Sequence, residues 1–210
     1  MEILTRIGAA LQEGDDEAVG RLTGEALAEG LAPRRILDEG LIGGMNAIGE
    51  QFRRHELFLP DVLLAAKAMY AGLDRLQPLL AAEGGALRGK VCLGTVRGDL
   101  HDIGKNLVAI MLRGAGFEVV DLGRDVAPRR FVDAARETGA LVVGMSALLT
   151  TTMPVMKEVV DLLRAEGLAG RVKTVVGGAP LSAAYAKEIG ADAYAYDAAH
   201  AIEVVKRLTA

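Results

Sequence analysis

The spacing of hydrophobic and polar residues along this chain changes once, near residue 90. Up to about residue 85, apolar residues recur at intervals of three and four, as in Ile3-Leu4-Ile7-Leu11. This spacing is typical of helices that bury one face. From Lys90 onward, short apolar runs alternate with amphipathic stretches of helical length, which favours β-α-β units and a parallel sheet. We therefore predict a helical domain at 1–86 and an α/β domain at 87–210.

Helix-breaking residues divide the helical part into four segments. Gly14-Asp15-Asp16 ends the first helix and caps the second, and Gly30-Leu31-Ala32-Pro33 separates the second from the third. The third helix is expected from about 33 to 54, and the fourth starts near Pro60-Asp61. Four amphipathic helices with short connections predict a four-helix bundle. Glu83-Gly84-Gly85 is predicted to be the interdomain linker.

The α/β part carries five predicted strands, each followed by a helix. Five parallel strands with helices on both faces form a doubly wound, flavodoxin-like sheet. We expect the strands at about 90–96, 117–121, 140–145, 172–177 and 192–195, and the helices at about 104–114, 128–138, 151–166, 181–189 and 198–208.

Composition narrows the possible partners. The 210 residues carry a net charge of -4 without basic clusters, so the electrostatic footprint of nucleic-acid binding is missing. The apolar runs are short and interrupted, and Glu2 and Arg6 stand where a signal peptide needs its apolar region. The single cysteine, Cys92, is expected to be a small buried hydrophobe in the first strand. We expect a soluble cytoplasmic protein that binds neither nucleic acid nor membrane.

The segment Asp99-Leu100-His101-Asp102-Ile103-Gly104-Lys105 places an imidazole between two carboxylates. It follows a predicted strand and opens a predicted helix, so His101 lies in a loop at the carboxyl edge of the sheet, where such folds bind ligands. A carboxylate two residues away can hold one ring nitrogen as a donor and leave the other free for a metal. A histidine that merely caps the helix is the alternative.

Two further loops at the same edge have unusual composition. Residues 146–152 form a hydroxyl-rich entry into a helix, with Ser146 followed by Thr150, Thr151 and Thr152. One of these hydroxyls is expected to cap the helix, but four exceed what a cap requires. After the fourth strand, Gly177-Gly178 would let the backbone approach a ligand closely or would form a tight turn.

Together these loops resemble the cobalamin-binding domain of B12-dependent methyltransferases, whose pattern is Asp-x-His-x-x-Gly, then Ser-x-Leu, then Gly-Gly. The pattern stands here as 99–104, 146–148 and 177–178, in order, at the ends of successive strands. Residues 44–52 and 57–60 resemble the helical cap that precedes this domain in methionine synthase and in small corrinoid proteins. The resemblance covers nearly the whole chain and is strongest to the stand-alone corrinoid proteins of methylamine, methanol and methoxyaromatic methyltransfer.

The resemblance implies roles for the matched residues. It makes His101 the lower axial ligand of cobalt in place of the displaced dimethylbenzimidazole, with Asp99 on the other ring nitrogen and Ser146 behind Asp99 as a relay. The remaining cofactor-binding residues that it implies are Gly98, Leu100, Asp102 and Gly104 around the corrin, Leu148 in the Ser-x-Leu motif, Thr150, Gly177 and Gly178 along the channel for the nucleotide tail, and Phe52 and Leu59 over the upper face of the corrin.

The implied function is that of a methyl carrier without catalytic residues of its own. Cobalamin would take a methyl group from a donor held by a substrate-specific methyltransferase subunit. It would pass the group to an acceptor methyltransferase that uses tetrahydrofolate or a thiol, and a reductive activator would rescue the Co(II) form. The cap would shield the methyl group and swing aside for each partner, with its hinge near 83–85. The methyl donor is set by the partner, so the sequence does not predict it.

Three other classes share parts of the pattern. An adenosylcobalamin mutase subunit shares the histidine motif but lacks the helical cap, and its chemistry needs a barrel that this chain has no room for. A B12-dependent transcription regulator also has a helical domain before this fold, yet 1–85 contains no basic recognition helix. A phosphoacceptor receiver needs an Asp where Gly144-Met145-Ser146 stands, and a dinucleotide-binding domain needs Gly-x-Gly-x-x-Gly after the first strand.

Overall fold

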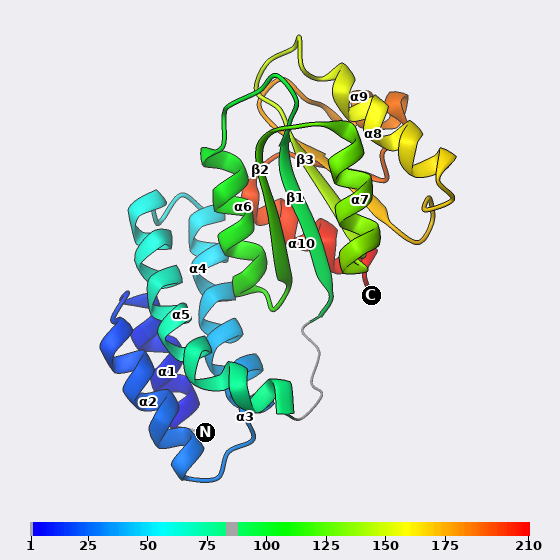
Figure 1. Ribbon diagram of the computed structural model, residues 1–210. Coiled ribbons are helices and arrows are strands. Elements are labelled where there is room, and N and C mark those ends of the chain that lie inside the picture. Colours follow the sequence, from blue (N-terminus) through cyan, green and yellow to red (C-terminus); the bar gives the residue numbers. More distant parts are fainter. Residues whose placement is uncertain (1, 83–87) are drawn as a thin grey trace. The chain divides into compact units, whose positions relative to one another are not determined.

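The computed structural model describes residues 2–82 and 88–210, which form two compact units (Figure 1). The helical unit comprises Met1–Leu87 with Gly114–Gly116, and the α/β unit comprises Arg88–Arg113 with Phe117–Ala210. The predicted linker, Glu83-Gly84-Gly85, lies outside the described residues.

The helical unit contains the four predicted helical segments. The third segment is continuous but changes its hydrogen-bonding pattern in the middle, because it includes a seven-residue π-helix. A π turn contains more residues than an α turn, and hydrophobic spacing alone does not reveal it. The elements are α1 (Glu2–Gln12), α2 (Asp16–Ala28), α3 (Pro33–Arg35), the π-helix η1 (Ile36–Ile42), α4 (Gly43–Arg53) and α5 (Leu59–Ala82).

Local sequence explains where these helices begin and how closely they pack. The Asp15 side chain accepts a hydrogen bond of 2.9 Å from the Ala18 amide and so caps α2. Gly8 of α1 faces Gly44 of α4, where a side chain on Gly44 would come within 3.0 Å of the Gly8 Cα. The two helices therefore cross at close range, and their fully buried leucines and isoleucines form the core of this unit.

The α/β unit has the predicted doubly wound architecture. Its five strands are all parallel, in the order β2-β1-β3-β4-β5. The strand order reverses between β1 and β3, which places the switch point at the ends of these two strands. The elements are β1 (Lys90–Val96), α6 (Ile103–Gly114), β2 (Glu118–Val126), α7 (Pro128–Thr138), β3 (Val142–Ser146), α8 (Pro154–Ala165), β4 (Lys173–Gly177), α9 (Ala183–Ile189), β5 (Ala193–Ala195) and α10 (Ala198–Leu208).

Two boundaries in this unit differ from the prediction by three residues or more. Strand β2 continues to Val126 rather than ending at 121, and its pairing with β1 is interrupted by register shifts near Gly94. Because β2 is an edge strand, it tolerates the polar residues that suggested an early end. Helix α8 begins at Pro154 rather than 151, since residues 150–153 form turns and proline suits a first helical position.

The two faces of the sheet are covered differently. Cys92, Val143 and Val176 point into a core cluster that also holds residues of α7 and α8. Their neighbours Val91, Val142 and Val175 point to the opposite face, where they line a cavity together with residues of α6 and α10. This alternation follows from the two-residue period of a strand. One face is thus a packed core, and the other leaves a hollow.

No helix in 2–82 or 88–210 combines the length and the apolar character needed to cross a bilayer. The cytoplasmic location stays a prediction.

Candidate functional site

Asp99 joins the two loops that leave the switch point of the sheet. Its side chain is fully buried at the end of β1. Carboxylate oxygen Oδ1 accepts the His101 amide at 3.0 Å, while Oδ2 accepts the amides of Leu148 at 2.7 Å and Leu149 at 3.1 Å from the loop after β3. Burial raises the pKa of the Asp99 carboxyl, but these hydrogen bonds together hold it well below its usual range. The buried group is therefore a carboxylate.

The His101 ring is oriented by that carboxylate. Its Nδ1 lies 2.7 Å from Oδ1 of Asp99. Because an ionised carboxylate only accepts hydrogen bonds, Nδ1 carries a proton, and in the neutral ring Nε2 then keeps its lone pair. The hydroxyl of Thr95 donates a 3.0 Å hydrogen bond to the His101 carbonyl and fixes the backbone. The side chain is nevertheless 52% exposed, so the ring is held at one nitrogen and available at the other.

Thr152, rather than Ser146, contacts Asp99. The Thr152 hydroxyl donates a 3.0 Å hydrogen bond to Oδ2 of Asp99 and lies within 2.9 Å of the Leu149 carbonyl. Ser146 ends β3 and lines the cavity, and no hydrogen bond joins it to Asp99 in the described structure. The hydroxyl that contacts Asp99 therefore lies six positions after the serine expected there, and the relay itself stays a prediction. The run of hydroxyls signalled a role beyond capping, but the spacing alone did not single out Thr152.

The other residues of the histidine loop take different positions. Gly98 has a φ of 84°, in the region that favours glycine. Asp102 is half-buried, and its carbonyl accepts the Asn106 amide at 2.8 Å in the first turn of α6. Gly104 has open space where a side chain would stand and also lines the cavity. His101 is thus the only histidine in a loop whose backbone is held by several hydrogen bonds.

An apolar rim borders the His101 ring. Leu100 and Ile103, which flank the histidine in sequence, are 61% and 72% exposed, and Leu148 and Leu149 on the adjoining loop are also exposed. Asp99 holds the two loops together through the amides of these leucines. Large apolar side chains that stay exposed on the two loops beside this imidazole provide a surface for the flat apolar face of a ligand that carries a metal.

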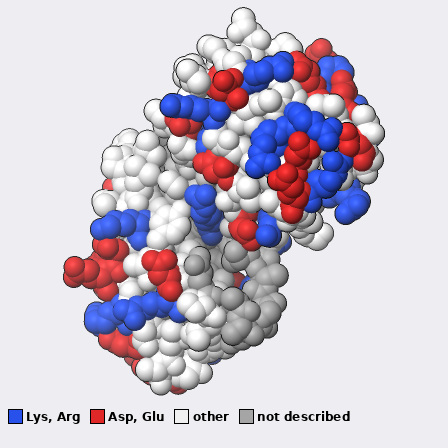
Figure 2. All heavy atoms as spheres, in the orientation of Figure 1, with Lys and Arg blue, Asp and Glu red and all other residues white. Residues whose placement is uncertain are grey.

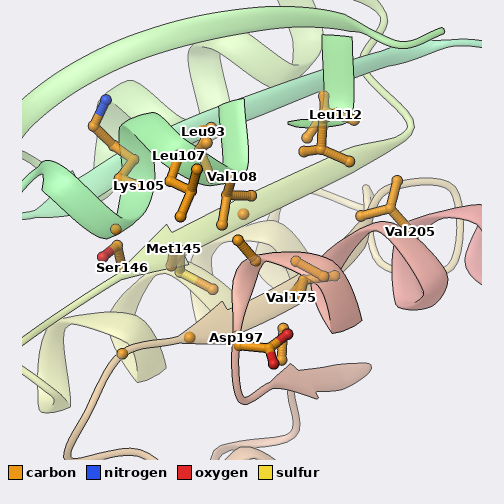
Figure 3. Close-up of a pocket in the computed structure, with 18 of the residues that line it drawn as sticks. Leu93, Lys105, Leu107, Val108, Leu112, Met145, Ser146, Val175, Asp197 and Val205 are labelled. Atoms are coloured by element: carbon orange, nitrogen blue, oxygen red, sulfur yellow. The ribbon is translucent and has the colours of Figure 1, made fainter. Parts of the chain in front are cut away.

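A cavity of about 290 Å³ opens beneath this edge, between α6, α10 and the sheet (Figure 3). Its walls are mainly apolar, with Ser146 and Asp197 among the polar residues that also line it. Val108 and Leu112 of α6 and Val205 of α10 project toward it, while the Lys105 amino group points away (Figure 3). The remaining lining includes Gly144, Gly177 and Gly178 from the strand ends. This volume suits an aromatic base rather than a whole cofactor.

The backbone requires glycine at 178, directly after β4, and leaves little room for a side chain at Gly177, the last residue of β4. A Cβ on Gly177 would lie 3.1 Å from the Ala195 carbonyl oxygen, and a Cβ on Gly178 would overlap the Ala147 carbonyl. Gly178 also has a φ of 137°. Both line the cavity, whereas Thr150 is exposed and is not among the lining residues. The channel for the nucleotide tail that the resemblance implies stays a prediction.

A buried lysine was missed at the sequence level. Lys105 is 3% exposed, and its Nζ lies 2.7 Å from Oδ1 of Asp121 and 2.6 Å from Oδ1 of Asn106. Burial raises the pKa of Asp121, but the hydrogen bonds from Lys105 and the Gly123 amide lower it below its usual range. The ion pair fastens the start of α6 to β2. Charge at a first helical turn is common, so the sequence carried no signal of burial.

Phe52 and Leu59 lie in the helical unit. They stand near the end of α4 and at the start of α5, and both are half-buried. Between them, His55 adopts a left-handed backbone with a φ of 60°. Their neighbour Phe58 is strongly exposed. An apolar surface therefore exists at this turn of the helical unit.

Comparison with known proteins identifies the family. Residues 89–206 match a family described as "B12 binding domain", and residues 3–77 match a second family with the same description. The chain belongs to the B12-binding family of corrinoid proteins. Cobalamin is its cofactor.

Relatives and solved structures agree with this assignment. The corrinoid protein is 46% identical over 211 residues to dimethylamine corrinoid protein 1 of Methanosarcina acetivorans, covering 100% of this chain and 98% of the relative. It is 44% identical to trimethylamine corrinoid protein 2 of the same species, covering 98% and 95% of the two chains. Among solved structures, the methanol:cobalamin methyltransferase complex MtaBC of Methanosarcina barkeri matches with a TM-score of 0.90 at 30% identity, covering 99% of this chain and 80% of that one.

The donor set of the corrinoid protein suits cobalamin. A corrin supplies most of the ligands of its own cobalt, so one further nitrogen, such as the free Nε2 of His101, would be enough for the protein to contribute. Within 2–82 and 88–210, no group of three or more His, Cys, Asp or Glu side chains could chelate a bare ion. The apolar rim would suit the flat face of the corrin, and the cavity would suit its aromatic base.

The charged surface of the corrinoid protein is mixed in sign. Figure 2 shows Lys and Arg interspersed with Asp and Glu on the visible face. Ion pairs also join α7 to the end of α8, where Glu166 binds both Arg129 at 2.6 Å and Arg136. The visible face has no single-sign stripe of the kind that nucleic acids require.

Proposed function

We propose that this corrinoid protein is a methyl carrier that holds cobalamin with its dimethylbenzimidazole displaced and His101 in the axial position. The observation that carries the proposal is the Asp99–His101 pair. It fixes the ring through Nδ1 and leaves Nε2 exposed on an apolar rim. A histidine that served only as a helix cap would not need a fully buried carboxylate behind its ring.

The chain's own residues orient the cofactor and tune the axial ligand. When bound, the cobalt of cobalamin supplies a nucleophile that accepts a methyl group and releases it to a second acceptor. Asp99 makes the imidazole a stronger ligand by accepting its Nδ1 proton in a hydrogen bond, and Thr152 supports the carboxylate from behind. The chain Thr152–Asp99–His101 is a route by which a proton can be taken up or released as the ligand binds or leaves.

The cavity is the place that we propose for the displaced base. Leu100, Ile103, Leu148 and Leu149 would contact the corrin, while the nucleotide tail would enter past Gly177 and Gly178. Asp102 and Gly98 would support this face of the loop, and Thr150 would lie at its rim. Lining by apolar side chains favours an uncharged aromatic base.

We assign residues 1–86 to a cap and residues 87–210 to the cofactor domain. Phe52 and Leu59 would cover the upper face of the corrin and exclude water from the transferred methyl group. Their half-buried position at one turn of the helical unit supports this role, because it leaves part of each side chain available to a ligand.

The partners follow from the relatives' names. Relatives named for dimethylamine and trimethylamine favour a methylamine as donor over methanol or a methoxyaromatic compound. A substrate-specific methyltransferase would deliver the methyl group, as the structure of the methanol:cobalamin methyltransferase complex suggests for its own corrinoid protein. A second methyltransferase that uses a thiol or tetrahydrofolate would remove the methyl group. A reductive activator would reduce protein whose cobalt had been oxidised to Co(II).

Electron paramagnetic resonance tests the ligation. The full chain, labelled with nitrogen-15 histidine and reconstituted with hydroxocobalamin, should in its Co(II) form show coupling to a protein nitrogen. His101→Ala should abolish that coupling. Coupling only to the benzimidazole nitrogen in the wild-type protein would refute the proposal.

A further inference from the structure

Asp125 adopts a backbone conformation that most residues avoid. Its φ is 55°, and in the described part of the α/β unit no other residue except glycine has a positive φ. Aspartate tolerates this region better than most residues, but glycine does so at lower cost. Such a conformation persists where the surroundings require it, and it is concentrated at functional sites.

Two hydrogen bonds connect Asp125 to the backbone just before His101. Its Oδ1 accepts the Gly98 amide at 2.7 Å, and its own amide donates to the Asp99 carbonyl at 3.0 Å. Both bonds join segments far apart in sequence. They hold the Arg97–Gly98 and Asp99–Leu100 peptide units, which flank the Gly98–Asp99 pair, from the direction of β2.

Gly98 is confined from the opposite direction as well. A Cβ at Gly98 would lie 3.3 Å from the Cγ2 of Thr152. The Gly98 segment is therefore enclosed between Asp125 and Thr152, and Thr152 in turn binds the Asp99 carboxylate. The positions of the Asp99 carboxylate and of the imidazole that it orients therefore depend on both Asp125 and Thr152.

We propose that Asp125 is a positioning residue for the cofactor, which keeps the Asp99–His101 pair aligned for axial ligation by fixing the backbone of Gly98 and Asp99. The inference rests on the proposed ligation by His101. Glycine would suit the φ of Asp125 better, so the presence of aspartate indicates that its carboxylate is used. The carboxylate's one hydrogen bond in the described structure is to Gly98.

Two substitutions separate the backbone conformation from the carboxylate. Asp125→Gly keeps the left-handed backbone accessible but removes the acceptor, while Asp125→Asn keeps an acceptor oxygen and tolerates the same φ. Asp15→Gly is a matched control, since Asp15 is also an exposed aspartate that accepts one backbone amide, but at the start of α2.

Each full-length variant is measured in two states. In the apoprotein, nuclear magnetic resonance reports the temperature coefficient and exchange rate of the Gly98 amide. After reconstitution with hydroxocobalamin, electron paramagnetic resonance of the Co(II) form reports the fraction with a histidine nitrogen on cobalt, and titration reports the affinity. Thermal unfolding confirms that the variants are folded.

Asp125→Gly should expose the Gly98 amide, lower the histidine-ligated fraction and weaken hydroxocobalamin binding by about two- to tenfold, the range expected for one hydrogen bond. Asp125→Asn should restore most of these properties, and Asp15→Gly should match wild type. A Gly variant with wild-type ligation and affinity, or an Asn variant as impaired as the Gly variant, would overturn the inference. Absence of histidine coupling in the wild type would instead refute the proposed function.

Discussion

The hydroxyl of Thr152 donates a 3.0 Å hydrogen bond to Oδ2 of Asp99, the carboxylate whose other oxygen lies 2.7 Å from the His101 ring. The two residues are far apart in sequence and come from the loops after β3 and β1. They share a buried site in which both carboxylate oxygens are occupied. The environment of the imidazole is therefore set partly from a second loop.

Thr152→Val should destabilise the apoprotein by about 1–3 kcal/mol, because it removes a donor from a buried charged group. It should also shift the Co(II)/Co(I) potential of the reconstituted protein, since the partner of a ligating histidine alters its basicity. Urea unfolding and spectroelectrochemistry measure the two effects. Thr152→Ser should resemble wild type, and Ser146→Ala should leave the potential unchanged. A larger potential shift in Ser146→Ala than in Thr152→Val would support the relay first expected from the sequence.

Asp99→Asn should reduce axial ligation by His101. If the amide oxygen accepts from Leu148 and Leu149, its NH2 group faces the ring, where Nδ1 must then become an acceptor. The imidazole proton moves to Nε2, which can no longer bind cobalt. The histidine-ligated fraction in electron paramagnetic resonance should fall while hydroxocobalamin still binds. Unaltered histidine coupling would show that the tautomer does not depend on the carboxylate.

The Lys105–Asp121 pair predicts a pH dependence of stability. The pKa of Asp121 is lowered in the folded protein, so the unfolded chain binds more protons near the ordinary aspartate pKa of about 3.9. The stabilisation is present above about pH 5 and is lost as pH falls through 4 and below. Lys105→Met should flatten this part of the profile in urea unfolding, while Lys157→Met, which breaks an exposed pair on α8, should not. Parallel profiles for the two variants would contradict the assignment.

Filling the cavity should separate binding of the nucleotide tail from binding of the corrin. Ala201 on α10 is 3% exposed and lines the cavity, so Ala201→Phe should take up space meant for the base. Affinity for cobalamin should drop at least about tenfold, whereas affinity for cobinamide, which lacks the nucleotide, should hold. Titration with both corrinoids, with melting of the apoprotein as a folding check, makes the comparison. Equal losses for both ligands would place the base elsewhere.

Phe52 and Leu59 should matter more to the cofactor than to folding. Both are half-buried, so replacing them by Ala should destabilise the apoprotein less than Ile48→Ala, which removes a fully buried core side chain at a cost of about 2–5 kcal/mol. Loaded with methylcobalamin, the double variant should lose its methyl group to light and water faster than wild type. Photolysis as slow as wild type, with a stability loss like that of Ile48→Ala, would assign both residues to the core.

Hydrophobic spacing sufficed for most of the fold. It located every strand and helix of the α/β unit because each packs one apolar face, as the alternation of Val142 and Val143 between cavity and core illustrates. It did not reveal the π-helix, where bonding changes without a change in apolar content. The spacing also predicted too early an end for β2, because polar residues such as Asp121, which an edge strand tolerates, are also typical of turns.

The site was predictable where chemistry depends on residue type and not where it depends on conformation. The association of Asp99 with His101 follows from their separation by two residues, and the structure confirms the hydrogen bond. Thr152 was missed because a turn before α8 brings it, rather than Ser146, behind the carboxylate. Lys105 and Asp125 were missed because burial and a left-handed backbone have no counterpart in the spacing of residues.

Gly178 affects how sequence variation in this family is interpreted. Any side chain there would overlap the carbonyl of Ala147 on the neighbouring loop, whatever ligand the cavity holds. A relative that lost its cofactor but kept its fold would therefore still need glycine at this position. The residue that corresponds to His101 could then be replaced. A glycine at this position in a relative would therefore indicate the close approach of two backbones rather than cofactor binding.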